Sequence, residues 1–286
     1  MATNYENMKL VNATRTTRSI PLKLLTTGQL HLLPIYYLMQ LSDLAREGIL
    51  NSGSHEFADH IYRSEASGQF MVGILIDKIL LALPSSRSFR NRYYHARDEI
   101  IRHALSNNKS QINILSIPSG IPREMIEAAS KLRKDFPVVF QRSKFYCVDK
   151  DPVALKKGME LIKEYQFTNF EVIRGDAFDV EAYPGEMDII TSTGFGEFLG
   201  DSDLSTFYNM CFEKLNSTGT FITSATVRHR FSDYLMKNIA ELITQYREEP
   251  IVSDIFSRTK FELSKLQRDA HGYQIFITAN KRTTNV

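Results

Sequence analysis

Residues able to hold a nucleoside follow three short apolar runs of this sequence. A turn of small residues ends at Gly120 after INILSI, and the next two runs end in carboxylates at Asp149 and Asp176. A carboxylate can accept two hydroxyl groups at once, and glycine lets the backbone approach a ligand without a Cβ in the way. An acid after the second strand is the arrangement that grips ribose hydroxyls. The pattern predicts a nucleoside bound where parallel strands end, with Asp149 on its ribose.

Each of these residues also has a plain structural interpretation. A single glycine is weak evidence for a ligand loop, so the turn at Gly120 also fits an ordinary strand-to-helix connection. Either Asp149 or Asp151 suits the N-cap of the helix expected from Pro152, and Asp176 suits a loop. The two carboxylates together favour the ligand interpretation, and the alternatives stay open.

Two stretches of different pattern must position these residues. From Gln29 to Asn107 apolar residues recur at helical spacing with no strand-like run among them. We expect four helices there, at 32–50, 54–68, 69–84 and 88–105, and a mobile lead-in over residues 1–20. The predicted domains are a helical cap over 1–107 and a nucleotide-binding domain over 108–286.

Strand-like and helix-like runs alternate after a polar hinge at 106–111. Strands are expected at 112–117, 144–149, 169–176, 187–194 and 219–225, weakly near Ile251, and at 273–281. Helices are expected from Arg123, and at 152–165, 204–215, 231–246 and 261–268. Such alternation implies right-handed crossovers and a sheet covered on both faces. The predicted fold class is therefore α/β, a Rossmann-like, doubly wound, mostly parallel seven-stranded sheet with an all-helical N-terminal cap.

The order of these motifs resembles the class I S-adenosylmethionine-dependent methyltransferase fold. ILSIPSG stands at the family's glycine-rich loop, VDKD at the acid after the second strand, VIRGDAFD at the acid after the third, and DIITSTGFGEF at the fourth-strand motif. The resemblance implies S-adenosylmethionine as cofactor. One departure is that the loop carries a single glycine where the family has two or three and an acid, so the methionine end of the cofactor is expected to sit differently.

The resemblance also implies a role for each matched residue. Asp149 would hold the ribose and Asp176 the adenine amino group, while Ala177 would offer its backbone N–H to the adenine and Phe178 would pack on the ring face. The remaining cofactor-binding candidates are the loop residues Ser116, Pro118 and Gly120 and the far wall formed by Thr193 and Gly194.

Tyr62, Arg63 and Ser64 are the candidates that the cap contributes. A Tyr-Arg-Ser segment before an LSIPSG-like loop is similar to a smaller bacterial group of methyltransferases. One interpretation is a lid, in which Arg63 or Ser64 meets the cofactor carboxylate and Tyr62 touches the sulfonium. The other is a helix face with Tyr62 half buried. Tyr93 and Tyr94 are candidates for the same wall, although tandem tyrosines in such a helix more often pack.

Glu197 is the second catalytic candidate beside Tyr62. It follows the fourth strand, where the resemblance places acceptor-binding groups, and a carboxylate there can remove a proton from an attacking oxygen or nitrogen. The alternative is a solvated loop acid. Arg228, His229 and Arg230 form a short basic run that suits either an acidic substrate or a solvated surface.

Composition narrows the function classes. The 286 residues carry 35 basic and 33 acidic side chains, a net charge of +2, so no global field argues for nucleic acid or an anionic membrane. Cys147 and Cys211 are expected to be core thiols, and His55 and His60 surface or cap residues. No metal site, signal segment or membrane span is apparent, which predicts a cytoplasmic protein; the oligomeric state is not indicated.

Three functions fit these expectations. The first is methyl transfer to a small-molecule acceptor enclosed by the cap, in specialised metabolism. The second uses the same cofactor intramolecularly: its α-amino group attacks its own γ-carbon, giving a four-membered cyclic amino acid and methylthioadenosine. The third is a non-catalytic binding or scaffold protein that keeps the fold. An RNA methyltransferase is weaker, because no basic face with interleaved aromatic residues is apparent.

Overall fold

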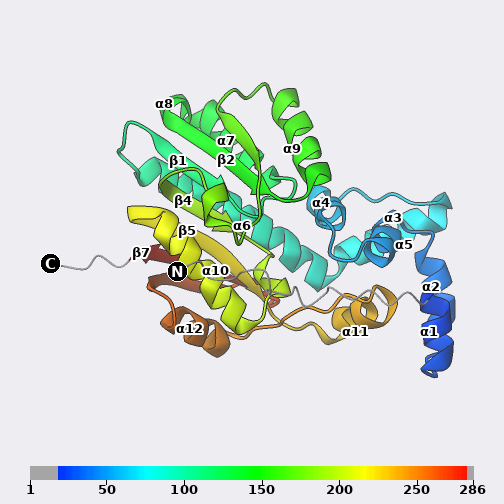
Figure 1. Cartoon of the computed structure of the whole chain (residues 1–286). Helices are drawn as coiled ribbons and strands as arrows, with labels where there is room; N and C mark the ends of the chain where they lie inside the picture. The colour runs from blue at the N-terminus through cyan, green and yellow to red at the C-terminus, as the bar shows by residue number, and fades with distance from the viewer. Residues whose placement is uncertain (1–18, 282–286) are drawn as a thin grey trace.

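A seven-stranded sheet forms the centre of the computed structural model, which describes residues 19–281 (Figure 1). Its strand order is β3-β2-β1-β4-β5-β7-β6, and β7 runs antiparallel to both of its neighbours. The strands are β1 (Ile112–Ser116), β2 (Ser143–Asp149), β3 (Phe170–Arg174), β4 (Met187–Ser192), β5 (Leu215–Thr226), β6 (Phe261–Arg268) and β7 (Gln274–Lys281). This sheet confirms the predicted Rossmann-like α/β fold. Strand order reverses between β1 and β4, and ligands of such sheets bind beyond that point.

Helices cover both faces of the sheet. One face carries α6, α7 and α9, whose apolar side chains pack around Ile114 and Phe145; the other carries α10 and α12, packed around Phe207 and Phe221. Because the central strands are buried on both sides, they appear in the sequence as unbroken apolar runs. The helices around the sheet are α6 (Pro84–Ser106), α7 (Arg123–Asp135), α8 (Pro137–Arg142), α9 (Pro152–Glu164), α10 (Asp201–Lys214) and α12 (Glu249–Ser257).

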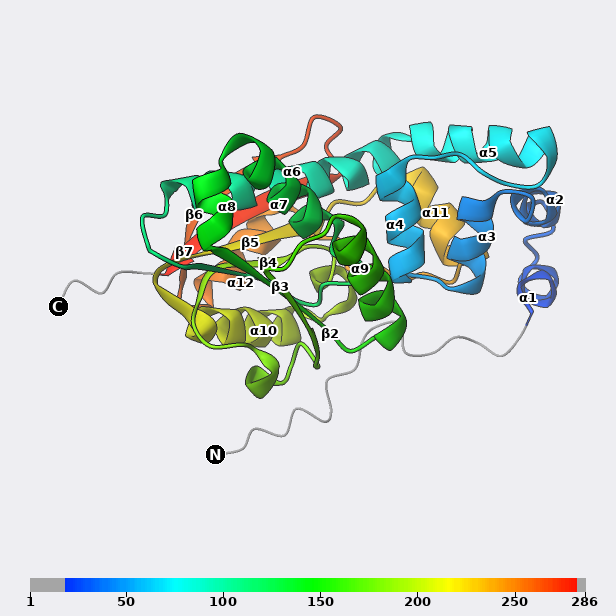
Figure 2. The same cartoon turned by 90° about the horizontal axis from the view of Figure 1, so that it is seen from above.

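A group of short helices lies beyond one end of the sheet (Figures 1 and 2). It consists of α1 (Ile20–Thr26), α2 (Leu32–Met39), α3 (Asp43–Leu50), α4 (His55–Arg63), α5 (Phe70–Ala82) and α11 (Arg230–Ile239). The prediction of one continuous helix over 32–50 is wrong, because the segment forms two helices, α2 and α3. Ser42 between them adopts an extended conformation and caps the N-terminus of α3 by accepting from the backbone N–H of Ala45. None of the helices between residues 19 and 281 is long and apolar enough to cross a bilayer.

The downstream half of the chain also contributes to this helical group. Ile239 and Leu235 of α11 pack with Leu24, Leu32 and Ile49 from α1, α2 and α3, and Figure 2 shows α11 between α3, α4 and α5. In the other direction, α6 runs from the helical group onto the sheet. The cap and sheet are therefore interlocked, and the domain boundary after residue 107 stays a prediction. The expected lead-in lies outside the described residues except at its last two positions, where Ile20 begins α1.

Two predicted elements near the C-terminus have the opposite type. The segment around Ile251 is helix α12, not a strand, because its buried residues Val252, Ile255 and Phe256 follow the helical period. Residues 261–268 form strand β6, not a helix. A register shift between Leu263 and Lys265 interrupts its alternation, so its sequence pattern imitates a helix.

A buried polar cluster joins three cap helices. Asp77 of α5 is fully buried and accepts hydrogen bonds from the hydroxyl of Ser42 and from the backbone N–H groups of Leu44 (3.2 Å) and Ser67 (2.9 Å). His60 Nε2 lies 3.2 Å from the same carboxylate, and this contact raises the pKa of His60. Of the two positions expected for His60, surface or cap, the structure shows the cap: it is a buried residue of α4.

Candidate functional site

A cavity of about 1180 Å³ lies between the carboxyl ends of the parallel strands and helices α3 and α4. It receives the loops that follow β1, β2, β3 and β4, so residues far apart in sequence meet there. The predicted residues that line it are Tyr62, Pro118, Gly120, Asp149, Asp176, Ala177, Phe178, Thr193, Gly194 and Glu197. Arg63, Ser64 and Ser116 are not among its lining residues.

Hydrogen bonds hold the loop after β1 in place despite its single glycine. Ser119 donates its backbone N–H to Val148 O (2.8 Å), and Gly120 donates to Asp149 Oδ2 (2.7 Å). Gly120 has φ +51°, in the left-handed region, which turns the chain toward α7. The loop is thereby tied to the tip of β2, next to the acid predicted to hold the ribose.

Asp149 keeps free acceptor capacity at the cavity. Its two oxygens accept from Gly120 N and from Asp151 N (2.9 Å), whereas an ionised carboxylate has about four lone-pair directions. Asp151, not Asp149, caps α9 by accepting from Val153 N (2.8 Å). The second of the two capping alternatives is the one observed, and the acceptor capacity left at Asp149 fits two ribose hydroxyls.

The loop after β3 offers an acid, a backbone segment and an aromatic ring to the same cavity. Asp176 Oδ1 accepts from Phe178 N (3.0 Å), so the turn role foreseen for Asp176 is present, and its other oxygen lies 3.9 Å from Lys150 Nζ. The hydroxyl of Tyr183 donates to Ala177 O (2.7 Å) and fixes the turn. An acid, a backbone segment and an aromatic ring in one loop suit the edge and the face of an adenine, the role that the resemblance implies for them.

A buried ion pair crosses the cavity wall, and sequence reasoning missed its cation. Arg92 of α6 is 3% exposed and pairs with Glu197, while its Nη2 donates to the Tyr62 hydroxyl (3.0 Å). Gly194 lies against the guanidinium with φ +86°, and a Cβ there would lie 2.7 Å from Arg92 Nη2. Glu197 is itself 8% exposed, so the alternative of a solvated loop acid is wrong.

Tyr62 belongs to an aromatic stack. Its ring centroid lies 5.3 Å from that of Phe89 and 4.9 Å from that of Tyr93, and burial raises the pKa of Tyr62. Tyr93 therefore packs behind Tyr62 and is not among the residues that line the cavity, and Tyr94 is 40% exposed. The stack holds a neutral phenol at the cavity, with its oxygen oriented by Arg92.

The other two residues of the Tyr-Arg-Ser segment lie outside the cavity. Arg63 is exposed and pairs with Asp59 (3.2 Å) and Glu65 (3.3 Å), and Ser64 ends α4 in a left-handed conformation with φ +56°. The structure does not bring them to the cofactor cavity, so their roles in a lid stay predictions. Asp59 also pairs with Arg123, which joins α4 to α7.

Glu124 is a second residue that sequence reasoning missed. It lies in the first turn of α7, is buried, lines the cavity, and accepts from Ser116 Oγ (3.2 Å). Burial raises the pKa of Glu124 to about 7. A glutamate in a charged, amphipathic helix resembles a solvated residue in sequence, and only the two buried neighbours Met125 and Ile126 give a hint.

The Glu124→Gln variant should show a pH-dependent gain in stability. A carboxyl whose pKa rises from 4.5 to about 7 on folding favours the folded state at low pH and loses that contribution as pH rises through 7. At pH 8 the variant should be more stable than the wild type by up to about 3 kcal/mol, falling toward zero at pH 4. Urea unfolding across this range measures it. The exposed Glu160→Gln on α9 is the control, and equal gains at pH 4 and pH 8 would contradict the assignment.

The sequence matches the model of a protein family described as "Putative methyltransferase" over residues 23–273. The chain belongs to this family. The match spans the cap as well as the sheet, so both parts are features of these methyltransferases. A comparison with curated proteins finds no match.

Solved structures of low sequence identity share the methyltransferase fold. A possible exported protein from Bordetella parapertussis aligns with a TM-score of 0.74 at 17% identity, over 90% of this chain and 88% of that one. Magnesium protoporphyrin IX methyltransferase from Synechocystis PCC 6803, with bound S-adenosylhomocysteine, aligns at 0.53 and 11% identity over 78% and 94%. The pyocyanin biosynthetic protein PhzM aligns at 0.53 and 13% over 92% and 72%.

The family match confirms two predictions from the sequence. The chain has the class I methyltransferase fold, and S-adenosylmethionine is the cofactor of the family. The residues present fit the adenosine part of that cofactor, since Asp149 with unused acceptor capacity and the Asp176 loop with its aromatic ring line one cavity. The assignment of individual site residues stays a prediction. Within residues 19–281 no group of three His, Cys, Asp or Glu side chains is arranged to hold a metal ion.

Proposed function

We propose that this methyltransferase transfers the methyl group of S-adenosylmethionine to a small-molecule acceptor. The observation that carries the proposal is that strand tips and cap residues line one and the same cavity, with Asp149 and Gly120 on one side and Tyr62 and Phe57 on the other. An acceptor must therefore fit between the cap and the sheet. A modest net charge of +2 agrees with a small acceptor better than with a nucleic acid.

The chain's own residues bind, orient and exclude water in this proposal. Asp149 accepts the ribose hydroxyls, Asp176 and Phe178 hold the adenine, and the stacked Tyr62 directs its oxygen to the cavity. The bound cofactor supplies a methyl carbon made electrophilic by the sulfonium. Glu197, held by Arg92 and by Thr226 Oγ1 (2.6 Å), is proposed to accept the proton of the attacking group.

The intramolecular reaction is the second candidate, and Glu124 is the observation that favours it. A buried carboxyl with its pKa near 7 lies at the cofactor cavity, behind the loop that ends in Gly120. In that reaction a base takes a proton from the cofactor's α-ammonium group, the amine nitrogen bonds to the γ-carbon, and the γ-carbon–sulfur bond breaks to release methylthioadenosine. Glu124 is the proposed base.

Incubating the purified protein with S-adenosylmethionine alone, and resolving the products, separates these functions. We expect the cofactor to bind and stay intact until an acceptor is supplied. Methylthioadenosine formed without an acceptor, and lost in Glu124→Gln, would replace the first proposal with the second. No binding of S-adenosylmethionine or S-adenosylhomocysteine in calorimetry would exclude both and favour a non-catalytic protein.

A further inference from the structure

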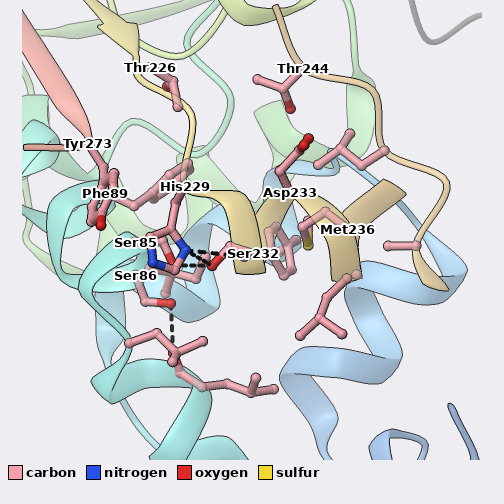
Figure 3. Close-up of a pocket in the computed structure, with 18 of the residues that line it drawn as sticks. Ser85, Ser86, Phe89, Thr226, His229, Ser232, Asp233, Met236, Thr244 and Tyr273 are labelled. Carbon is pink, nitrogen blue, oxygen red and sulfur yellow. Dashed lines mark hydrogen bonds between the residues drawn. The ribbon is translucent and has the colours of Figure 1, made fainter. Parts of the chain in front are cut away.

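A second, smaller cavity of about 180 Å³ adjoins the cofactor cavity (Figure 3). It lies between α11, the cap helices and the ends of β5 and β7. Phe57, Phe89, Glu197 and Leu242 line both cavities, so the two spaces meet at the carboxylate proposed to accept the acceptor's proton. The volume is close to the roughly 150 Å³ of an apolar cavity that holds benzene.

The smaller cavity has an apolar side and a polar side. The cap and α11 supply the apolar side chains, namely Met39, Leu44, Ala45, Ile49, Ile61, Leu80, Leu83, Leu235, Met236 and Ile239. The polar groups come from the ends of β5 and β7 and from the first turn of α11, and include Thr226, His229, Asp233, Tyr273 and Gln274. An apolar wall facing a few polar groups is typical of a small-molecule site, because the wall binds and the polar groups orient.

Gln274 lines this cavity and carries an unused acceptor. The residue is 2% exposed, its Nε2 donates to Thr226 Oγ1 (2.8 Å), and Thr226 Oγ1 in turn donates to Glu197 Oε1 (2.6 Å). Among the described residues, Gln274 Oε1 is buried with no hydrogen-bond partner. A buried acceptor left unpaired costs about 1–3 kcal/mol. A ligand carrying an O–H or N–H donor would remove that cost.

His229 adds a donor to the same polar side. Its Nδ1 accepts from Ser232 N (3.1 Å), so Nε2 is the ring nitrogen that carries a proton. Ser232 Oγ lies 2.8 Å from the same Nδ1 and 2.7 Å from Ser85 Oγ, which joins α11 to the first turn of α6 (Figure 3). The ring is thus held in one orientation, with a donor left to meet a ligand oxygen.

We propose that this cavity is the acceptor subsite, and that it takes a single six-membered ring bearing at least one hydroxyl or amino group that donates to Gln274 Oε1. The inference rests on the proposed methyl transfer, since it places the acceptor beside Glu197 at the junction with the cofactor cavity. A volume of about 180 Å³ suits a single ring, and the chain Gln274–Thr226–Glu197–Arg92 links acceptor recognition to the cofactor wall.

Phenol and toluene are the probes that test this subsite, because they differ by a hydroxyl in place of a methyl group. Calorimetry is carried out on the protein saturated with S-adenosylhomocysteine. Gln274→Leu removes the acceptor and should lower the ratio of phenol to toluene affinity at least tenfold. Gln267→Leu, on exposed β6, is the matched control and should leave the ratio unchanged. Ala45→Phe, which fills the cavity from α3, should abolish binding of both probes.

Binding of S-adenosylhomocysteine is measured in each variant and reports on the proposed function separately. If the wild type does not bind S-adenosylhomocysteine, the methyltransferase proposal itself is overturned. If it binds with unchanged affinity in all variants while the phenol-to-toluene ratio does not respond to Gln274→Leu, the subsite is wrong. If neither probe binds the wild type, the subsite is also wrong. Should Ala45→Phe fail to fold, the Gln274 comparison decides alone.

Discussion

Replacing Asp149 with alanine should weaken binding of S-adenosylmethionine and S-adenosylhomocysteine by at least 100-fold. The carboxylate is the group proposed to accept both ribose hydroxyls, and hydrogen bonds to a charged acceptor contribute about 1.5–3 kcal/mol each. Two such bonds correspond to a loss of about 100-fold or more in affinity. The same change leaves Gly120 N without its acceptor, so the loop after β1 keeps only the Ser119 N to Val148 O hydrogen bond to β2.

Asp151→Asn is the matched control for this variant. It removes the same charge two residues away and keeps a side-chain oxygen to cap Val153 N. We expect its affinity to stay within a few-fold of the wild type. Titration calorimetry measures both variants, and thermal unfolding without ligand confirms that they are folded. Equal affinity of Asp149→Ala and wild type would remove the ribose contact on which the cofactor orientation depends.

Local sequence patterns predicted the central strands correctly. They failed at β6 and α12, where the pattern of apolar residues fits both a strand and a helix. Strands β1, β2, β4 and β5 are buried on both faces, so their apolar runs are continuous and their ends are clear. The edge strand β6 pairs on one side only and contains a register shift, and its neighbour α12 is short. In this region the sequence pattern therefore predicted a strand where α12 lies and a helix where β6 lies.

The residues proposed to bind the cofactor could be predicted from the sequence, because each of them lies at the end of a strand or just after it. Asp149 and Asp176 lie at tips of adjacent strands, and parallel topology alone brings them together. The cap half was not accessible in the same way. Arg92 looks like a surface arginine of an amphipathic helix, and His229 and Gln274 come from segments that are far from the cap in sequence.

The surroundings of Tyr62 depend on tertiary contacts that cannot be predicted from the spacing of residues in the sequence. Tyr62 was identified from its motif, yet Arg63 pairs with Asp59 and Ser64 ends α4, so neither lines the cavity. The residue that orients Tyr62 is Arg92, from a helix 30 positions downstream. The Tyr-Arg-Ser segment therefore marked the correct end of α4. The polar groups beside Tyr62 in the cavity wall come from the ion pair between Arg92 and Glu197.

That ion pair should have the largest effect on stability in the site. Replacing Arg92 with methionine leaves Glu197 buried beside Thr226 without its cation, and breaking a buried pair in this way costs about 3–5 kcal/mol. Urea unfolding measures the loss. Arg97→Met on the same helix is the control: its pairs with Asp98 and Glu127 involve half-exposed carboxylates, so a loss of about 1 kcal/mol or less is expected.

The double variant Arg92→Met/Glu197→Gln distinguishes an unpaired charge from lost packing. A neutral amide at position 197 still accepts from Thr226 and leaves no buried charge, so the pair of changes should recover most of the stability that Arg92→Met loses. If the double variant is as unstable as Arg92→Met, the guanidinium contributes chiefly by packing on Phe89 (3.8 Å to the ring centroid) and Gly194. In the first case Arg92 stabilises the buried carboxylate of Glu197, which makes this arginine the positioning residue for the proposed proton acceptor.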